Sequence, residues 1–287
     1  MFPQLFDGFL QSPVVQRAVR KENLALEIID IKEFAPGSFR HIDDSPFGGG
    51  AGMVMRCQPV LDALRHVKGG AAGGQVTADG GGAAGKPGTT DGNGAAGNPG
   101  TAADGGTAVG PVPGACACVT AALSPAGAVF CQKTARRYKD LDHLILICGH
   151  YEGMDERILR HVDEEISIGD YILTGGEIAA MAVSDAVIRL LPGALRKEST
   201  TEESFEDGLL EYPQYTQPAV YEGEPVPAVL LSGDHEKIRK WRLKESLRRT
   251  LKRRPDLLED RKLTPEEEAL LREVFAEEEA CGGGAPA

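Results

Sequence analysis

Four glycine-containing clusters are the residues of this sequence best suited to chemistry. They read DDSPFGGGAGM at 43–53, LSPAG at 123–127, CGHYEGMDER at 148–157 and SIGDYILTGGE at 167–177. Glycine lets the backbone approach a ligand closely and present its N–H and C=O groups to it. Each cluster alone also fits a tight turn that needs glycine, but four together favour a ligand site. No Lys-Ser or Lys-Thr follows GGGAGM, and none of the four clusters contains a GxGxxG fingerprint, so neither common nucleotide loop explains them.

Short apolar runs alternate with helical patterns around these clusters. Strands are predicted at 26–31, 118–123, 143–148, 166–173 and 228–231. Helices are predicted at 13–21, 58–67, 154–161 and 177–191. The run HLILIC at 143–148 is apolar on both faces, which is typical of a central parallel strand covered by helices. The pattern predicts an α/β fold with a mostly parallel sheet, in which the clusters lie at strand ends, where such sheets bind ligands.

The chain divides into segments of different composition. Residues 69–114 are rich in Gly, Ala, Thr, Pro and Asp, with almost no large apolar side chains, and predict a disordered insertion. We expect a sheet domain over 1–195, a mobile polar linker at 196–207 and a small helical domain at 208–287. Its two helices are predicted over 234–253 and from the Thr-Pro-Glu-Glu at 264–267, a helix-start signal.

The charge is distributed unevenly. The whole chain carries −12, but residues 237–254 contain ten Lys or Arg and one Glu, a local charge of +9 that leaves −21 on the rest. Such a basic segment on an acidic body predicts contact with the phosphates of a nucleic acid. The alternative is a solvated helix face that balances the acidic body.

The six cysteines form no CxxC pair and have no histidine at zinc-finger spacing. We therefore expect free thiols, with a metal site at Cys116 and Cys118 as the less favoured alternative. No stretch approaches the length of a membrane helix, and the N-terminus lacks a signal-peptide pattern, so we expect a cytosolic protein.

Long motifs in this sequence resemble a known family. DDSPFGGGAGM, CGHYEGMDERILRHVDEEISIGDYILTGGEIAAM, GLLEYPQYTQP and VLLSGDHEKIRKWR are similar to the bacterial tRNA (guanine-N1)-methyltransferases of the knotted SPOUT superfamily. The resemblance covers nearly the whole chain apart from the insertion and the termini. It implies a trefoil-knotted catalytic domain, a homodimer, and transfer of a methyl group from S-adenosylmethionine to N1 of the guanine 3′ of the tRNA anticodon.

The same resemblance implies which residues bind the cofactor. S-adenosylmethionine would be held by three loops, whose residues are Leu123, Ser124, Pro125, Gly149, Tyr151, Glu152, Gly153, Ile168, Gly169, Asp170, Tyr171, Ile172 and Leu173. Backbone amides and carbonyls can hold the adenine, while a carboxylate such as Glu152 favours the sulfonium. The resemblance also raises Mg²⁺ as a cofactor, although no Asp or Glu cluster in the sequence forms a recognisable metal site.

Methylation at guanine N1 requires a base, because N1 carries a proton that must leave. A cation near O6 would stabilise the charge that collects there. Arg189 matches the family's catalytic arginine, and Glu203 stands where the family has an aspartate base ahead of Ser-Phe. Glu202 is a competing assignment, and both glutamates could instead be solvated loop charges.

RNA contacts are expected from two regions. The resemblance implies Asp43, Gly48 and Gly52 in the first cluster. The basic helix contributes Lys237, Arg239, Lys240, Arg242, Lys244 and Arg248. Trp241 is expected in the core, since it falls on the apolar side of this helix.

Two rival functions stay open at this stage. A knotted methyltransferase that modifies another nucleotide, such as a ribose hydroxyl, would not need the carboxylate base. A non-catalytic homologue would bind tRNA with a steep salt dependence and transfer no methyl group.

Overall fold

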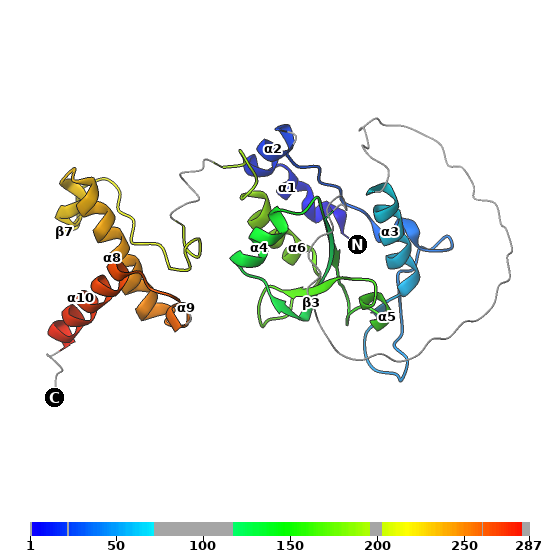
Figure 1. Ribbon diagram of the computed structural model, residues 1–287. Helices are drawn as coiled ribbons and strands as arrows, with labels where there is room; N and C mark the ends of the chain where they lie inside the picture. The colour runs from blue at the N-terminus through cyan, green and yellow to red at the C-terminus, as the bar shows by residue number, and fades with distance from the viewer. Residues whose placement is uncertain (1, 22, 72–116, 196–202, 260, 283–287) are drawn as a thin grey trace. The chain divides into compact units, whose positions relative to one another are not determined.

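The computed structural model describes residues 2–21, 23–71, 117–195, 203–259 and 261–282. The chain forms two compact units, which we describe separately (Figure 1). The first unit comprises Met1–Phe9, Glu27–Phe130 and Asp140–Ser184, and the second comprises Leu10–Leu26, Cys131–Lys139 and Asp185–Ala287. The second unit thus takes in segments that precede residue 195, and the domain boundaries expected from the sequence stay a prediction.

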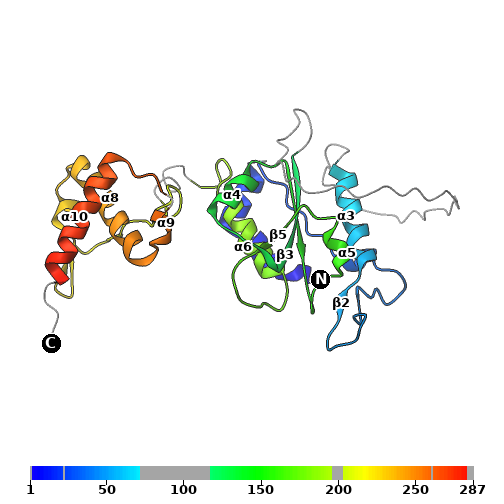
Figure 2. The same cartoon turned by 60° about the horizontal axis from the view of Figure 1, so that its bottom comes forward.

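The first unit is built on a parallel three-stranded sheet, whose strands β3 and β5 are visible side by side in Figure 2. Its order is β4-β3-β5, with β3 at Cys118–Val129, β4 at His143–Cys148 and β5 at Glu164–Ser167. The predicted α/β class is confirmed. The prediction that HLILIC is the central strand is wrong: within the described residues β4 lies at an edge, and of its six residues only Ile147 is buried.

Three strand predictions differ from the structure. Residues 26–30 are irregular and lead into the 3-10 helix η2 (Ile31–Phe34). Residues 168–173 are not strand, because Gly169 turns the chain with a φ of 142° directly after β5. Residues 228–231 form the 3-10 helix η3 (Ala228–Leu231), in which Leu230 N–H donates to the carbonyl of Pro227 at 2.9 Å.

The predicted helices are present with shifted ends. They are α2 (Pro13–Arg20), α3 (Cys57–Ala71), α5 (Glu156–Leu159), α6 (Glu177–Ile188), α8 (His235–Arg253) and α10 (Pro265–Gly282). Because α3 continues to Ala71, the first three residues of the predicted insertion are helical, and 72–114 lie outside the described residues. None of the described helices is long and apolar enough to cross a membrane.

The remaining elements are short. They are η1 (Pro3–Phe6), α1 (Asp7–Leu10), β1 (Asp43–Asp44), β2 (Val54–Met55), α4 (Gln132–Lys139), β6 (Val220–Tyr221), β7 (Glu224–Pro225) and α9 (Asp256–Glu259). Strands β1 and β2 pair antiparallel, so residues 45–53 form the loop of a hairpin that carries the first glycine cluster.

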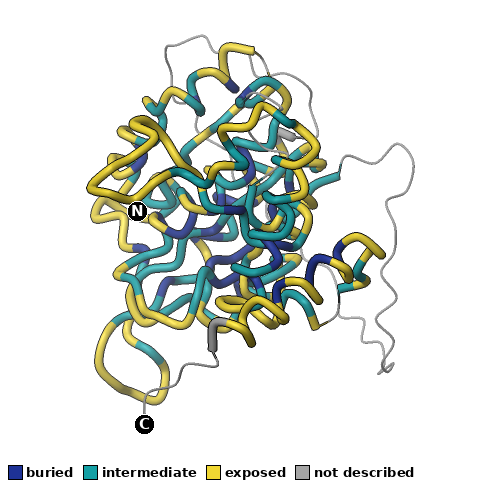
Figure 3. The backbone as a smooth tube through the Cα atoms, turned by 90° about the vertical axis from the view of Figure 1, so that its left-hand side faces the viewer, coloured by how far each residue is buried: buried dark blue, intermediate teal, exposed yellow. Residues whose placement is uncertain are grey.

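Buried positions occur in short stretches flanked by exposed chain, as the dark blue segments of Figure 3 show. In the first unit, Met55, Val60, Ile147 and Ile158 form a cluster that joins β2, α3, β4 and α5. This cluster fixes the start of α3 and the end of β4 relative to one another, and both flank glycine clusters.

The C-terminal helices have a core of their own. Leu209, Leu247, Leu270 and Leu271 pack together, and Leu243 and Leu251 pack against them. Burying these side chains supplies the hydrophobic free energy that holds α8 against α10. The predicted start of α10 is confirmed as a capping box: Thr264 N–H donates to Glu267 Oε2 at 2.7 Å, and Glu267 N–H donates to Thr264 Oγ1 at 3.2 Å.

Candidate functional site

A cavity of about 660 Å³ in the first unit gathers three of the four glycine clusters. Its first wall lies where β3 is irregular: pairing with β4 ends at Leu123, and the register against β5 shifts between Leu123 and Ala128. The bulged residues Ser124 and Pro125 line the cavity with Leu123. A β-bulge beside a cavity is a common feature of functional sites, because it turns backbone groups away from the ladder.

The second wall is the loop after β4. Gly149, Tyr151, Glu152 and Gly153 all line the cavity. Tyr151 has a φ of 58°, in the left-handed region that non-glycine residues rarely adopt. Such strain persists only where surrounding contacts hold it, which is frequent at functional sites.

The hairpin loop of the first cluster lies against this second wall. Glu152 N–H donates to the carbonyl of Met53 at 3.0 Å. Gly52 has a φ of 86°, which residues with a side chain rarely adopt, and an added Cβ would also displace the side chain of Glu152, so the position favours glycine. Burial raises the pKa of the Tyr151 hydroxyl, and the neighbouring carboxylate of Asp43, to which it is hydrogen-bonded, raises it further. The structure therefore brings two of the predicted RNA-binding residues, Asp43 and Gly52, beside the predicted cofactor loop.

The third wall follows β5. Ile168, Gly169, Tyr171, Ile172 and Leu173 line the cavity. Asp170 is exposed and is not among the lining residues, so twelve of the thirteen residues predicted to bind the cofactor line one cavity.

The sequence analysis missed part of the lining. His150, Gly175 and Gly176 also line the cavity, and Glu177 lies beside it with 3% of its surface exposed. His150 Nε2 is 3.8 Å from Glu177 Oε2. The TGGE segment at 174–177 belongs to the fourth cluster, so the sequence carries a signal for these residues beyond Leu173, where the expected cofactor loop ends.

Two glycines let backbone segments meet at this cavity. A Cβ at Gly176 would lie 2.8 Å from Cys148 Cα, and one at Gly149 would lie 3.3 Å from the carbonyl oxygen of Leu123. Gly176 N–H also donates to the carbonyl of Gly149 at 2.7 Å. These contacts explain why glycines cluster at the strand ends: the loops touch through their main chains.

The described cysteines, Cys57, Cys118, Cys131 and Cys148, are free thiols, as expected. Cys116 and the Cys281 side chain lie outside the described residues, so the Cys116 and Cys118 metal alternative stays untested. Burial raises the pKa of the Cys148 thiol to about 12, and the carboxylate of Glu177 adds to this effect. The pKa of the exposed Cys131 thiol is lowered, chiefly because the backbone N–H of Thr134 donates to it.

We expect Cys131 to react with iodoacetamide at least about tenfold faster than Cys148 at pH 8, since the thiolate is the nucleophile. Timed alkylation of the folded protein, followed by peptide mass spectrometry, measures both rates. Equal rates at the two cysteines would contradict the shielding of Cys148 beside the cavity.

The predicted catalytic pair lies in the second unit, and its two members contact each other. Arg189 Nη1 and Nη2 each donate to one carboxylate oxygen of Glu203, both at 2.6 Å. Both side chains are between a quarter and a third exposed, so solvent or a ligand can reach them. The hydrogen bonds to Glu203 raise the pKa of Arg189 above its ordinary value. Glu202, the competing assignment, lies outside the described residues.

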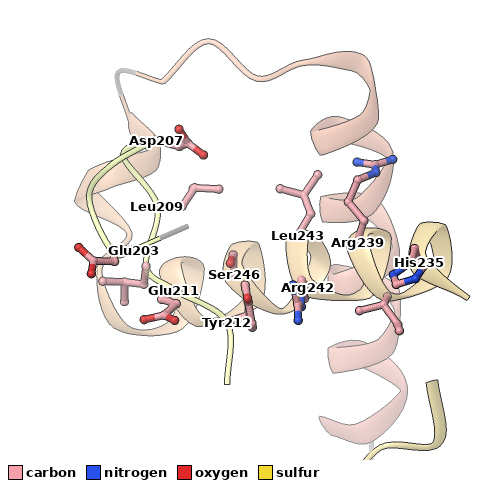
Figure 4. A pocket seen from close by; sticks show the side chains of 12 residues that line it. Glu203, Asp207, Leu209, Glu211, Tyr212, His235, Arg239, Arg242, Leu243 and Ser246 are labelled. Carbon is pink, nitrogen blue, oxygen red and sulfur yellow. The ribbon is translucent and has the colours of Figure 1, made fainter. Parts of the chain in front are cut away.

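Glu203 also lines a second cavity, of about 430 Å³, between residues 203–212 and α8. Figure 4 shows the carboxylates of Glu203, Asp207 and Glu211 on one side of it. The side chains of His235, Arg239 and Arg242 lie on the other side, with Leu209 and Leu243 between the two groups. The cavity is therefore acidic at one end and basic at the other.

At least four of the nine cations of the basic helix α8 form ion pairs with carboxylates of the described residues. Lys237 pairs with Asp234, Arg239 with Glu266, and Lys244 with Glu273 and Glu277. Arg248 pairs with Glu245 and Glu277, and Arg242 lies over the ring of Tyr212 at 4.7 Å. Most of these acids belong to α10, which packs beside α8. Contact with RNA stays a prediction, and it would have to compete with these intramolecular ion pairs.

Trp241 is half-buried, with its ring 6.4 Å from that of Tyr215. Gly48, the third predicted residue of the first cluster, is exposed in the hairpin loop with a φ of 90°. Among the described residues no group of three or more His, Cys, Asp or Glu side chains could hold a metal ion, and a role for Mg²⁺ stays a prediction.

These features define an α/β protein with a ligand cavity at the ends of parallel strands and a partly exposed arginine–carboxylate pair. The comparison with family models names the family. The model described as tRNA (Guanine-1)-methyltransferase TrmD matches residues 1–79 and 101–260, and the chain belongs to this family. The family predicted from the sequence motifs is thus confirmed.

Curated relatives agree with this assignment. Proteins named tRNA (guanine-N(1)-)-methyltransferase from Geobacillus kaustophilus and Fusobacterium nucleatum are each 42% identical to the chain, over 97% of both sequences. One from Listeria innocua is 42% identical over 95% of both.

Proposed function

We propose that this chain is an S-adenosylmethionine-dependent enzyme that methylates N1 of the guanine immediately 3′ of the tRNA anticodon. The observation that carries the proposal is the match to the tRNA (guanine-1)-methyltransferase family over nearly the whole chain. The cavity at the strand ends and the pairing of Arg189 with Glu203 support it independently, because the reaction needs both a cofactor site and a base.

The strand-end cavity fits S-adenosylmethionine. Its volume of about 660 Å³ falls within the range of small-molecule sites, about 300–1,000 Å³. Glycines in its lining let a ligand approach the main chain closely, and Glu152 offers a carboxylate. When bound, S-adenosylmethionine supplies an electrophilic methyl group on a positively charged sulfur. A carboxylate beside the cavity favours that charge.

Glu203 is proposed as the base that takes the N1 proton. A carboxylate has about four lone-pair positions, and Arg189 occupies one on each oxygen, so Glu203 can still accept a hydrogen bond from guanine N1–H. Arg189 likewise retains three of its five N–H donors, one of which can be directed at O6. The pair therefore holds the base in one orientation and keeps a cation next to the atom that gains negative charge.

The finer parts of the proposal rest on family membership. They are a trefoil knot in the catalytic domain, a homodimer, and a helical tRNA-binding domain at the C-terminus. A cytosolic location is also proposed, on the sequence patterns alone. Asp43 and Gly52 beside the cavity, and Gly48 in the exposed hairpin loop, are proposed to contact the anticodon loop. The cations of α8, with exposed Lys240 among them, are proposed to contact backbone phosphates.

The test is methyl transfer to two tRNA transcripts that differ only in having G or A immediately 3′ of the anticodon. We expect label from methyl-labelled S-adenosylmethionine to appear as 1-methylguanosine in the G transcript alone. The measurement is chromatography and mass spectrometry of the nucleosides after digestion.

The products distinguish the alternatives. Ribose-methylated nucleosides would indicate a methyltransferase of other specificity. Absence of label on both transcripts, with tRNA binding that weakens steeply with salt, would indicate a non-catalytic homologue.

A further inference from the structure

We propose that Gln132 and Arg136 of α4 are positioning residues for the methyl transfer, because they hold Glu206 and thereby fix the turn that carries Glu203. This inference rests on the proposed function, in which Glu203 is the base. It assigns roles to three residues outside the cavities and outside the motifs that carry the resemblance.

Arg136 and Gln132 both form hydrogen bonds with Glu206, Arg136 with its main chain and side chain and Gln132 with its side chain. Arg136 Nη2 donates to the carbonyl oxygen of Glu206 at 2.5 Å and also to its carboxylate. Gln132 Nε2 donates to Glu206 Oε1 at 3.1 Å. The two donors are four residues apart, so they project from the same face of α4. The side chain of Glu206 is only 16% exposed, so this contact is better shielded than a typical surface ion pair.

Hydrogen bonds within the turn connect Glu206 to Glu203. Glu206 N–H donates to the carbonyl of Glu203 at 3.2 Å, and Phe205 N–H donates to the carbonyl of Leu209 at 2.7 Å. Phe205 has a φ of 71°, a strained conformation for a residue with a side chain that persists only where neighbouring contacts enforce it. The turn therefore depends on external contacts for its shape.

The other end of the turn is fixed to the C-terminal helices. Leu210 N–H donates to Thr250 Oγ1 at 2.9 Å, and Arg261 donates to the carbonyl of Asp207. Near Glu203, Arg136 and Gln132 of α4 hold Glu206, Arg189 pairs with Glu203 itself, and Glu211 N–H donates to Ser204 Oγ at 2.9 Å. Loss of the α4 contacts would loosen the turn on the side of Glu206, and a displacement on the order of 1 Å can cost about 100-fold in rate.

The test uses Arg136→Ala in the full-length protein. We expect kcat to fall about tenfold, with the KM values for tRNA and S-adenosylmethionine within about twofold of wild type, since the base is misplaced and binding is not. Arg136→Lys should recover part of the loss, because lysine keeps the charge but cannot reach the carbonyl and carboxylate together. Lys133→Ala is the matched control: it removes an exposed cation from the same helix and should leave kcat unchanged.

A charge exchange tests the pair itself. The double variant Arg136→Glu with Glu206→Arg should be more active than either single variant, because the ion pair is restored in reverse. A double variant no better than both singles would contradict the proposal. A kcat of Arg136→Ala within about twofold of wild type would also contradict it. A rise in the KM for tRNA with kcat unchanged would contradict it as well, since it would make Arg136 an RNA contact.

Hydrogen exchange separates this inference from the proposed function. The amides of Phe205 and Glu206 should exchange faster in Arg136→Ala than in wild type or Lys133→Ala. If wild-type protein fails to methylate tRNA, the proposed function falls, while the exchange rates still decide whether α4 holds the turn. If the two amides exchange at the wild-type rate in Arg136→Ala, α4 does not hold the turn, and this inference is wrong whether or not the protein methylates tRNA.

Discussion

Glu203→Gln should lower the rate of methyl transfer about 100- to 10,000-fold, the range that general-base catalysis typically contributes. Glutamine keeps the length of the side chain, and its amide oxygen can still accept a hydrogen bond from Arg189, but it cannot take the N1 proton. The measurement is the single-turnover rate constant with saturating S-adenosylmethionine and a limiting G transcript. Cofactor affinity should be unchanged, because Glu203 does not line the strand-end cavity.

Two further variants decide between the alternatives for the base. Glu203→Asp keeps a carboxylate, at the family's side-chain length, and should retain activity within about tenfold of wild type if the carboxylate is what matters. Glu202→Gln tests the competing assignment. Loss of activity in Glu202→Gln, with Glu203→Gln active, would move the base to Glu202. Full activity in both variants would leave the two glutamates without a role in catalysis.

Elements with strong local signals were predictable from the sequence. The apolar runs at β3 and β4 and the capping box of α10 are encoded within a few residues, and the structure contains all three. Strand order is not local: HLILIC looks like a central strand, but which strands flank it depends on chain crossings. The short run AVLL at 228–231 follows a proline and closes a 3-10 turn instead of finding a strand partner.

The candidate site was predictable where a long motif covers it. The resemblance placed twelve residues around one cavity, although composition alone would have left each glycine cluster as a possible turn. The contacts of α4 with Glu206 could not be predicted, since they join residues 70 and 74 positions apart that belong to no shared motif. The ion pairs between α8 and α10 could not be predicted for the same reason, since in the sequence the two helices are simply one basic and one acidic segment.

Gly176→Ala should weaken S-adenosylmethionine binding about 10- to 100-fold, because overpacking at a tight contact costs roughly 1–3 kcal/mol. The added Cβ would lie 2.8 Å from Cys148 Cα and 2.9 Å from Gly149 N, and main chain cannot move aside as a flexible side chain can. The loop after β4 must therefore shift, and with it the backbone groups that line the second wall. Titration calorimetry with S-adenosylmethionine measures the effect.

Gly8→Ala is the matched control for this substitution. No atom lies within 4 Å of a Cβ at Gly8, and its place in α1 favours alanine, so binding should equal that of wild type. Thermal unfolding of both variants identifies any general loss of structure. A folded Gly176→Ala protein that binds S-adenosylmethionine within about twofold of wild type would show that the close approach of Gly176 to Cys148 and Gly149 does not shape the cofactor site.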